Sequence, residues 1–285
     1  MRTLNKILLL TSGLFILMTA CDKLEAPYVT KLDKITPDPG DEIRKVLLEE
    51  YTGHKCPNCP TGSKVAHDLK QIYGEQLIVV SVHAGFFAYP DPDGLYTEDY
   101  RTTVGTELNN YFNIQSYPKG LVNRTEYNQT LVLGKDSWEP AVNELLEVPA
   151  EAKLEINHEY NPDTRKLDIN VDTEFLTEMN GTFSVSTYII EDSLVSPQKN
   201  DNQNLGPVPD WEDYTHQHVL RMAVNGSWGE PVNNGQSVLP NTVYQGSCSI
   251  TLDDAWVAEN CHIVSFVYRN DTREIIQAEE HSVVD

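Results

Sequence analysis

Two cysteines separated by two residues, Cys56 and Cys59, stand where an apolar run of strand length gives way to a helical pattern. The run covers residues 45–51. After the cysteines, apolar residues recur at helical spacing up to a glycine at position 74. A second apolar run, residues 77–82, has the composition of a strand buried on both faces. The sequence therefore predicts a strand–helix–strand unit with a cysteine pair at its first strand-to-helix junction.

The next 65 residues extend this unit. The spacing predicts helices over residues 97–112 and from Asp136 to Leu146, and a strand pair over 120–124 and 129–133. A Cys-x-x-Cys at the first strand-to-helix junction is typical of thioredoxin-like domains. In that fold a cis-proline lies beside the cysteines just before a strand, and Pro118 is at the matching position. We therefore expect a thioredoxin-like domain over residues 44–149.

This resemblance implies a redox role for the cysteine pair. Cys56, near a helix N-terminus, would be stabilised as a thiolate and would attack a disulfide, and Cys59 would resolve the mixed disulfide. Thioredoxins often place a buried carboxylate about six residues before the first cysteine. Glu50 has that position, although Glu49 competes for it. The predicted catalytic set is Cys56, Cys59, Pro118 and Glu50.

Other roles for the cysteine pair stay open. A zinc site would need a second ligand pair, which the spacing does not supply. His54, Cys56, Cys59 and His83 are a candidate copper set, and His54 with Lys55 would otherwise add positive potential beside Cys56. A structural disulfide without activity is a further alternative. We expect no metal and no cofactor.

The second half of the chain has a different pattern. Residues 153–158 and 167–172 alternate polar and apolar side chains around an Asn-Pro-Asp turn, which predicts a hairpin. Further strands are expected over residues 182–191, 236–238, 246–252, 262–268 and 274–278. Several short strands of this kind favour an Ig-like antiparallel β-sandwich over residues 150–285. The predicted fold class is thus α/β followed by all-β.

Two pairs of side chains in this half of the chain could act together, one as a disulfide and one as metal ligands. Cys248 and Cys261 fall on or beside neighbouring predicted strands, so we expect a structural disulfide, with two buried free thiols as the alternative. His216 and His218 would point to one face of an extended segment. They are a candidate metal pair, but structural histidines with ordinary hydrogen bonds explain them as well.

The N-terminus has the features of a bacterial secretion signal. Residues 1–20 combine the basic Arg2 and Lys6 with an apolar stretch too short to span a bilayer. The run Met18-Thr19-Ala20-Cys21 resembles a lipobox, in which the cysteine is lipidated. Residues 21–43 contain several prolines and no sustained period, as a tether would. We expect attachment to the membrane through acyl chains on Cys21.

The charge of the chain excludes one class of partner. The sequence has 43 acidic and 21 basic side chains, a formal net charge of −22. Removal of residues 1–20 leaves 43 acidic against 19 basic side chains, a charge of about −24. Nucleic-acid backbones are bound by clustered Lys and Arg, so we expect no nucleic-acid partner.

Three sequence blocks carry a resemblance to a family. They are the lipobox, residues 51–60 (YTGHKCPNCP), and residues 216–221 (HQHVLR) with Trp228-Gly229. The chain resembles the Bacteroidetes 28-kilodalton outer-membrane-protein family, whose lipoproteins combine a thioredoxin-like region with a β-sandwich. The resemblance implies an outer-membrane lipoprotein of the cell envelope.

Two functions remain in view. The first is thiol–disulfide exchange on envelope proteins through the cysteine pair. The second is a non-enzymatic lipoprotein that binds a protein or glycan, motivated by the aromatic residues in and near the loop 85–94. These residues are Phe86, Phe87, Tyr89 and Tyr96.

Overall fold

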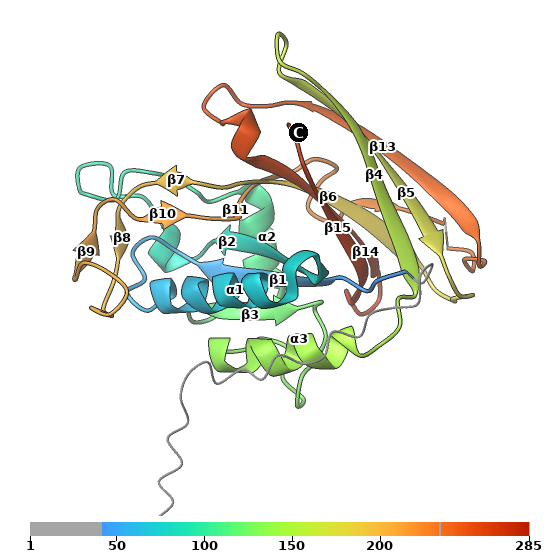
Figure 1. The fold of residues 1–285 in the computed structure, drawn as a ribbon, viewed down its shortest axis with the longest axis horizontal. Coiled ribbons are helices and arrows are strands. Elements are labelled where there is room, and N and C mark those ends of the chain that lie inside the picture. Colours follow the sequence, from blue (N-terminus) through green and yellow to red (C-terminus); the bar gives the residue numbers. More distant parts are fainter. Residues whose placement is uncertain (1–41, 234, 285) are drawn as a thin grey trace, which may run out of the picture. The chain divides into compact units, whose positions relative to one another are not determined.

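An eight-stranded mixed sheet runs through the residues that the structure describes, 42–233 and 235–284, in a computed structural model of the chain (Figure 1). Its strands follow the order β15-β14-β6-β11-β2-β1-β3, and β12 (Glu230–Pro231) also pairs with β6. The predicted signal peptide, Cys21 and the tether up to residue 41 lie outside the described residues.

The first half of the chain contributes one end of this sheet. Strand β1 (Val46–Thr52) leads into helix α1 (Cys59–Tyr73), and β2 (Leu77–His83) returns parallel to β1. Strand β3 (Lys119–Val122) pairs antiparallel with the other edge of β1. The predicted strand–helix–strand unit is confirmed: β1 is shifted by one residue from the expected 45–51, and β2 ends one residue later than expected.

Helices cover both faces of this part of the sheet because β1 and β2 are apolar on both sides. Leu48 and Val79 pack against α1 and α3 (Trp138–Leu146). Leu47 and Val80 point to the opposite face, where they meet α2 (Thr103–Tyr111). Short 3-10 turns precede several of these elements: η1 (Gly74–Gln76), η2 (Phe86–Ala88) and η3 (Lys135–Ser137).

The second half is β-rich, as expected. Strands β4 (Ala152–Asn161), β5 (Lys166–Phe175) and β13 (Thr242–Thr251) form a separate antiparallel sheet in the order β13-β5-β4. The remaining long strands join the eight-stranded sheet: β6 (Phe183–Glu191), β11 (Val219–Ala223), β14 (Cys261–Arg269) and β15 (Ile275–Ser282). A 3-10 turn, η4 (Ala258–Asn260), precedes β14. The three-stranded sheet packs on Ile189 and Ile263 of the larger one.

The two halves share hydrogen bonds within a single sheet. Strand β11 lies parallel to β2 with Val219 opposite Ser81, and the Ser81 amide donates to the His218 carbonyl at 2.7 Å. The eight-stranded sheet therefore crosses the predicted domain boundary at residues 149–150. Division into two domains at that point remains a prediction.

Several expected elements differ in extent. Helix α2 begins at Thr103, six residues later than predicted, because the Thr102 hydroxyl accepts from the Gly105 amide and caps it there. Leu133 and Val238 lie in predicted strands, but each makes only an isolated bridge. Strand β6 is buried on both faces, with Tyr188 in one core cluster and Ile189 in another.

The expected disulfide between Cys248 and Cys261 is wrong. Both cysteines are free thiols: Cys248 is half-buried on β13, and Cys261 is buried at the start of β14. These strands belong to different sheets, so the two residues are not neighbours in one ladder. Both side chains pack in the apolar cluster between the sheets, where burial raises the pKa of the Cys261 thiol to about 12.

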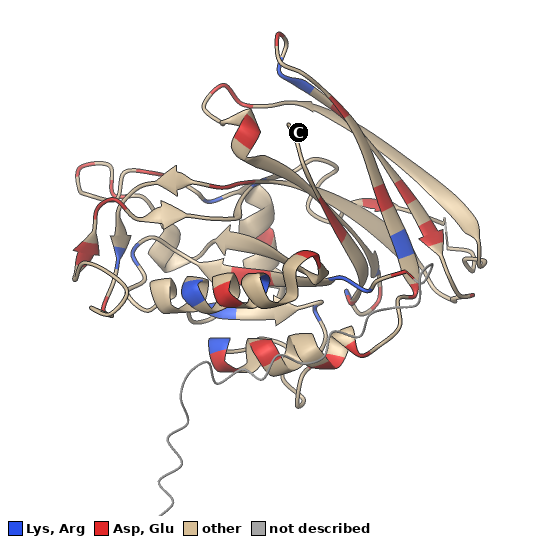
Figure 2. Ribbon diagram, in the orientation of Figure 1, with Lys and Arg blue, Asp and Glu red and all other residues tan. Residues whose placement is uncertain are grey.

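Acidic residues are spread over helices, strands and loops of the described chain and do not gather on one element (Figure 2). The three-stranded sheet is one example, since Glu155 lies opposite Asp172 and Glu159 opposite Asp168. Among the helices of residues 42–284, none is long and apolar enough to cross a membrane.

Candidate functional site

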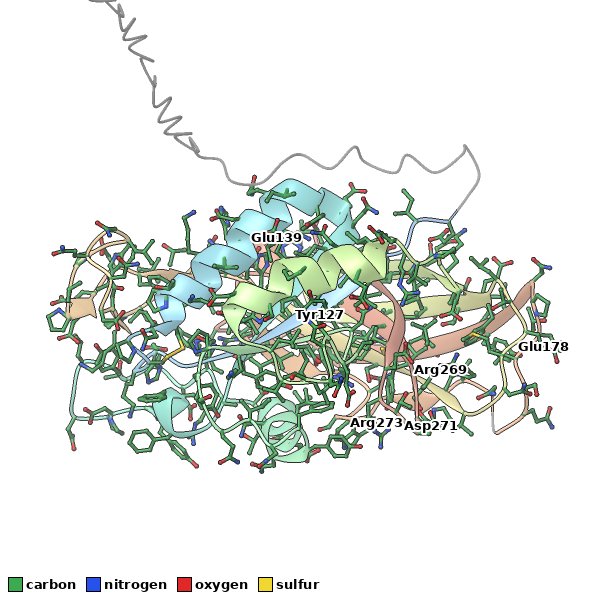
Figure 3. All side chains as sticks on the ribbon, turned by 90° about the horizontal axis from the view of Figure 1, so that it is seen from below. Tyr127, Glu139, Glu178, Arg269, Asp271 and Arg273 are labelled. Atoms are coloured by element: carbon green, nitrogen blue, oxygen red, sulfur yellow. A yellow bond between two sulfur atoms is a disulfide. The ribbon has the colours of Figure 1, made fainter. Side chains whose placement is uncertain are left out.

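The Cys56 and Cys59 side chains form a disulfide at the start of helix α1, visible as a yellow bond in Figure 3. Helix α1 begins at Cys59, and Asn58 is its N-cap residue. The amide of Cys59 donates to the Cys56 carbonyl at 3.2 Å, so the cysteines bracket a tight turn that leads into the helix. Each cysteine is only 1% exposed, although the turn residue Asn58 is exposed.

Pro118 lies against the first turn of this helix. Its peptide bond with Tyr117 is cis. A Cβ atom added to Gly62 would be 2.7 Å from the Pro118 Cβ atom, so helix and proline fit closely only because residue 62 is glycine. The structure thus brings Pro118, Gly62 and the cysteine pair together at one end of α1.

Glu50 and Glu49 point to opposite faces of β1. The Glu50 carboxylate accepts a hydrogen bond from the Ser63 hydroxyl of α1 at 2.9 Å, and the Ser81 hydroxyl is 3.5 Å away. Burial raises the pKa of Glu50 to about 7. Glu49 instead forms a buried ion pair with Arg124, with N–O distances of 2.6 and 2.7 Å. Of the two carboxylates, Glu50 lies on the α1 side.

His54 is buried beside the cysteines. Its Nε2 atom lies 3.2 Å from the carbonyl oxygen of Tyr89, and its ring stacks on Tyr96. Burial lowers the pKa of His54, so the imidazole is neutral at pH 7. The expected positive potential beside Cys56 therefore does not come from this side chain.

A segment from the second half of the chain lies directly on the cysteine loop. It is the hairpin 194–216, built from β7 (Leu194–Val195), β8 (Gln198–Lys199), β9 (Asp210–Trp211) and β10 (Thr215–His216). The Gln198 side-chain amide donates to the Cys56 carbonyl at 3.0 Å. Two backbone amides donate to the same loop: Lys199 to His54 at 2.7 Å and Asp201 to Pro57 at 3.1 Å.

The sequence did not predict that the hairpin 194–216 lies on the cysteine loop. Residues 196–209 are polar and rich in Asn and Pro, and nothing in such a loop indicates which distant segment it will contact. The buried state of Gln198, at 2% exposed, is the structural sign that it has a specific role.

A cavity of about 320 Å³ lies between α1, β2 and the hairpin 194–216. Glu50, His83 and His216 are part of its lining. His83 is 3% exposed, and neither of its ring nitrogens has a hydrogen-bond partner among the described residues. Burial lowers the pKa of His83 well below its usual value, so the ring is neutral at pH 7.

The candidate metal sets are not assembled within residues 42–233 and 235–284, where no group of three His, Cys, Asp or Glu side chains is placed to hold an ion. His216 and His218 have separate partners. The Nε2 atom of His216 lies 3.0 Å from the Ser196 hydroxyl, whereas His218 Nδ1 lies 3.2 Å from the Asp192 carboxylate.

Comparison with known proteins begins with solved structures. HBP35 of Porphyromonas gingivalis is similar in fold, with a TM-score of 0.62 and 17% sequence identity over 86% of this chain and 76% of that one. A domain of the outer membrane lipoprotein Omp28 from the same organism is 27% identical over 46% of this chain and 86% of that one, with a TM-score of 0.28. The search of curated proteins gives no match.

The family comparison covers most of the second half and the end of the first. The family described as Outer membrane protein Omp28 matches residues 106–284, which is more than half of the chain. The match confirms the family resemblance and includes residues 216–229, whereas the blocks at residues 18–21 and 51–60 lie outside it. The chain belongs to the Omp28 family of outer membrane proteins.

Proposed function

We propose that this protein is anchored through lipidated Cys21 and exchanges disulfides with envelope proteins through Cys56 and Cys59. The cysteine pair would lie in a thioredoxin-like unit over residues 44–149, followed by an Ig-like domain over residues 150–285. One observation carries the proposal: the two cysteines are bonded to each other at the start of helix α1. Parallel β1 and β2 joined by that helix support the thioredoxin-like assignment.

The disulfide form accepts two electrons. A thiolate of a substrate dithiol attacks the Cys56 sulfur, the Cys56–Cys59 bond breaks, and Cys59 leaves as a thiolate. The second substrate thiolate then attacks the substrate sulfur of the mixed disulfide, which releases Cys56 and leaves the substrate oxidised. The reverse sequence reduces a substrate disulfide, with Cys56 as nucleophile and Cys59 as resolving thiol.

Two features of the site support this chemistry. The free amides at the N-terminus of α1 would stabilise the Cys56 thiolate after reduction. Glu50 lies beneath the first turn of that helix, and its pKa of about 7 lets it take up or give a proton near neutral pH. We propose that it serves the resolving thiol Cys59.

Trapping in the native envelope tests the proposal. A Cys59→Ser protein should accumulate mixed disulfides between Cys56 and its substrates, which denaturing electrophoresis and mass spectrometry would identify. The Cys56→Ser, Cys59→Ser double variant is the matched control. Absence of any adduct specific to the single variant, in protein shown to be folded, would refute disulfide exchange.

The burial of both sulfurs favours a second candidate function. A disulfide that is 1% exposed can serve as a brace in a protein that binds its partner without chemistry. Phe86 and Tyr89, on the loop beside the cysteines, are 76% and 54% exposed and would offer a contact surface. A double cysteine variant that keeps the full phenotype of the wild type would favour this function over exchange.

A further inference from the structure

The hairpin 194–216 lies on the loop that carries the Cys56–Cys59 disulfide, and both cysteines are almost completely buried. Disulfide exchange requires the attacking thiolate to reach a sulfur atom, and reactivity therefore depends on access. Cys56 and Cys59 are each 1% exposed, and the hairpin contacts the loop that carries them through Gln198, Lys199 and Asp201. Exchange would require this arrangement to open.

The tip of the hairpin is held together by its own hydrogen bonds. The Asn200 side-chain amide donates to three carbonyls at 3.0 Å each, those of Asn202, Gly206 and Pro207. The Asn200 backbone amide donates to the Pro209 carbonyl at 2.9 Å. Asn200 is 1% exposed, so it acts as an internal tie. The tip can therefore move as one body without losing its own structure.

The base of the hairpin is narrow. Strands β7 and β10 pair over only two positions, Leu194 opposite His216 and Val195 opposite Thr215. The residues just outside this stem, Ser193 and His218, have left-handed backbones with φ of 63° and 56°. Such φ values are uncommon for residues other than glycine, and here they mark both ends of the element at its junction with the sheet.

The closed position is held by the backbone amides of Lys199 and Asp201, described above, and by a few side chains. Gln198 bonds the Cys56 carbonyl and reaches the Gly53 carbonyl at 3.4 Å. At strand β9 of the hairpin, the Asp210 carboxylate accepts a hydrogen bond from the Tyr96 hydroxyl, which lies outside the hairpin. The same carboxylate accepts from Lys199 Nζ, within the hairpin, at 3.0 Å. Because each such bond contributes only about 0.5–1.5 kcal/mol net, the closed state can open locally without unfolding the protein.

We infer that the hairpin 194–216 is a gate on the Cys56–Cys59 disulfide, closed in this structure and opened by movement about its two-pair stem. The inference rests on the proposed exchange function for its biological purpose. The gate itself can be tested independently of that function, because it requires only that opening of the hairpin, and not unfolding of the protein, limits attack on the disulfide.

The rate of disulfide reduction in the native protein tests the gate. Dithiothreitol attacks one sulfur, the Cys56–Cys59 bond breaks, and the second thiol of the reagent forms its cyclic disulfide and releases the other cysteine. Two electrons pass from reagent to protein. Acid quenching, alkylation and peptide mass spectrometry would follow Cys56 and Cys59 in the full-length chain, separately from the other cysteines.

Gln198→Ala and Tyr96→Phe loosen the gate from its two ends. We expect Gln198→Ala to be reduced about tenfold faster than the wild type, the factor that corresponds to ~1.4 kcal/mol in the opening equilibrium. Tyr96→Phe should be reduced severalfold faster. Gln71→Ala, an exposed change on α1, is the matched control and should leave the rate unchanged.

A core variant separates local opening from unfolding. Val142 is fully buried in α3, away from the hairpin, so Val142→Ala lowers global stability without touching the gate. The gate predicts an unchanged reduction rate for this variant. Acceleration by Val142→Ala equal to that by Gln198→Ala, or no acceleration by Gln198→Ala, would overturn the inference. If Gln198→Ala is reduced faster as expected but Cys59→Ser traps no substrate, the gate stands and only the exchange function is refuted.

Discussion

Replacement of Glu50 by glutamine should stabilise the protein, and more so as the pH rises. Glu50 is 1% exposed, and burial raises its pKa from 4.5 to about 7. Between those values the folded protein holds a proton that the unfolded chain releases, so the free energy of unfolding falls as pH rises. Glutamine resembles the protonated acid: its carbonyl can accept from Ser63 and its amide can donate to Ser81.

The size of the effect follows from the two pKa values. Between pH 4.5 and about 7, the free energy of unfolding of the wild type falls by about 1.36 kcal/mol for each pH unit. The total loss of stability above pH 7 is therefore about 3 kcal/mol. Below pH 4.5 the loss is absent. The stability of Glu50→Gln relative to the wild type should therefore rise by about 3 kcal/mol between pH 4 and pH 8, a large share of a typical 5–15 kcal/mol.

Denaturant unfolding of both proteins at several pH values, without reductant, measures this difference. Other titrating groups are common to both proteins and cancel. Glu144→Gln, an exposed change on α3, is the control and should show no such trend. A difference between Glu50→Gln and the wild type that stays constant from pH 4 to pH 8 would show that the Glu50 carboxyl is not desolvated as described.

Three further outcomes are expected. Arg124→Ala leaves the buried Glu49 carboxylate unpaired and should cost about 3–5 kcal/mol in denaturant unfolding. Gly62→Ala puts a methyl group 2.7 Å from Pro118 and should destabilise by about 1–3 kcal/mol, although alanine is otherwise the better helix former; a stabilised variant would contradict the packing. A Cys21→Ser chain, denatured without reductant, should show two reactive thiols by a colorimetric assay, because one disulfide and two free cysteines are present.

The sequence predicted the elements around the cysteines because their signals are local. The apolar runs that became β1 and β2, and the helical spacing after Cys59, depend only on neighbouring residues. The choice between Glu49 and Glu50 could not be made in this way. It depends on which face of β1 meets α1 and on Arg124, 75 residues further along the chain.

The cover over the cysteines and the state of the other two cysteines were beyond sequence reasoning. Gln198 reaches the Cys56 carbonyl across 142 residues, and no periodicity encodes such a contact. The disulfide expected between Cys248 and Cys261 assumed that consecutive predicted strands are neighbours, whereas the strands that carry these residues join different sheets. Pairing between strands is set by tertiary structure, which short-range patterns do not contain.

The pairing of β2 with β11 has a consequence for biogenesis. A chain synthesised from its N-terminus contains β2 well before residues 219–223 have been made. Until they arrive, the β2 edge that later pairs with Val219 exposes unpaired amides and carbonyls, a template for aggregation. The sheet around the cysteines is therefore complete only after residues 219–223 have been made.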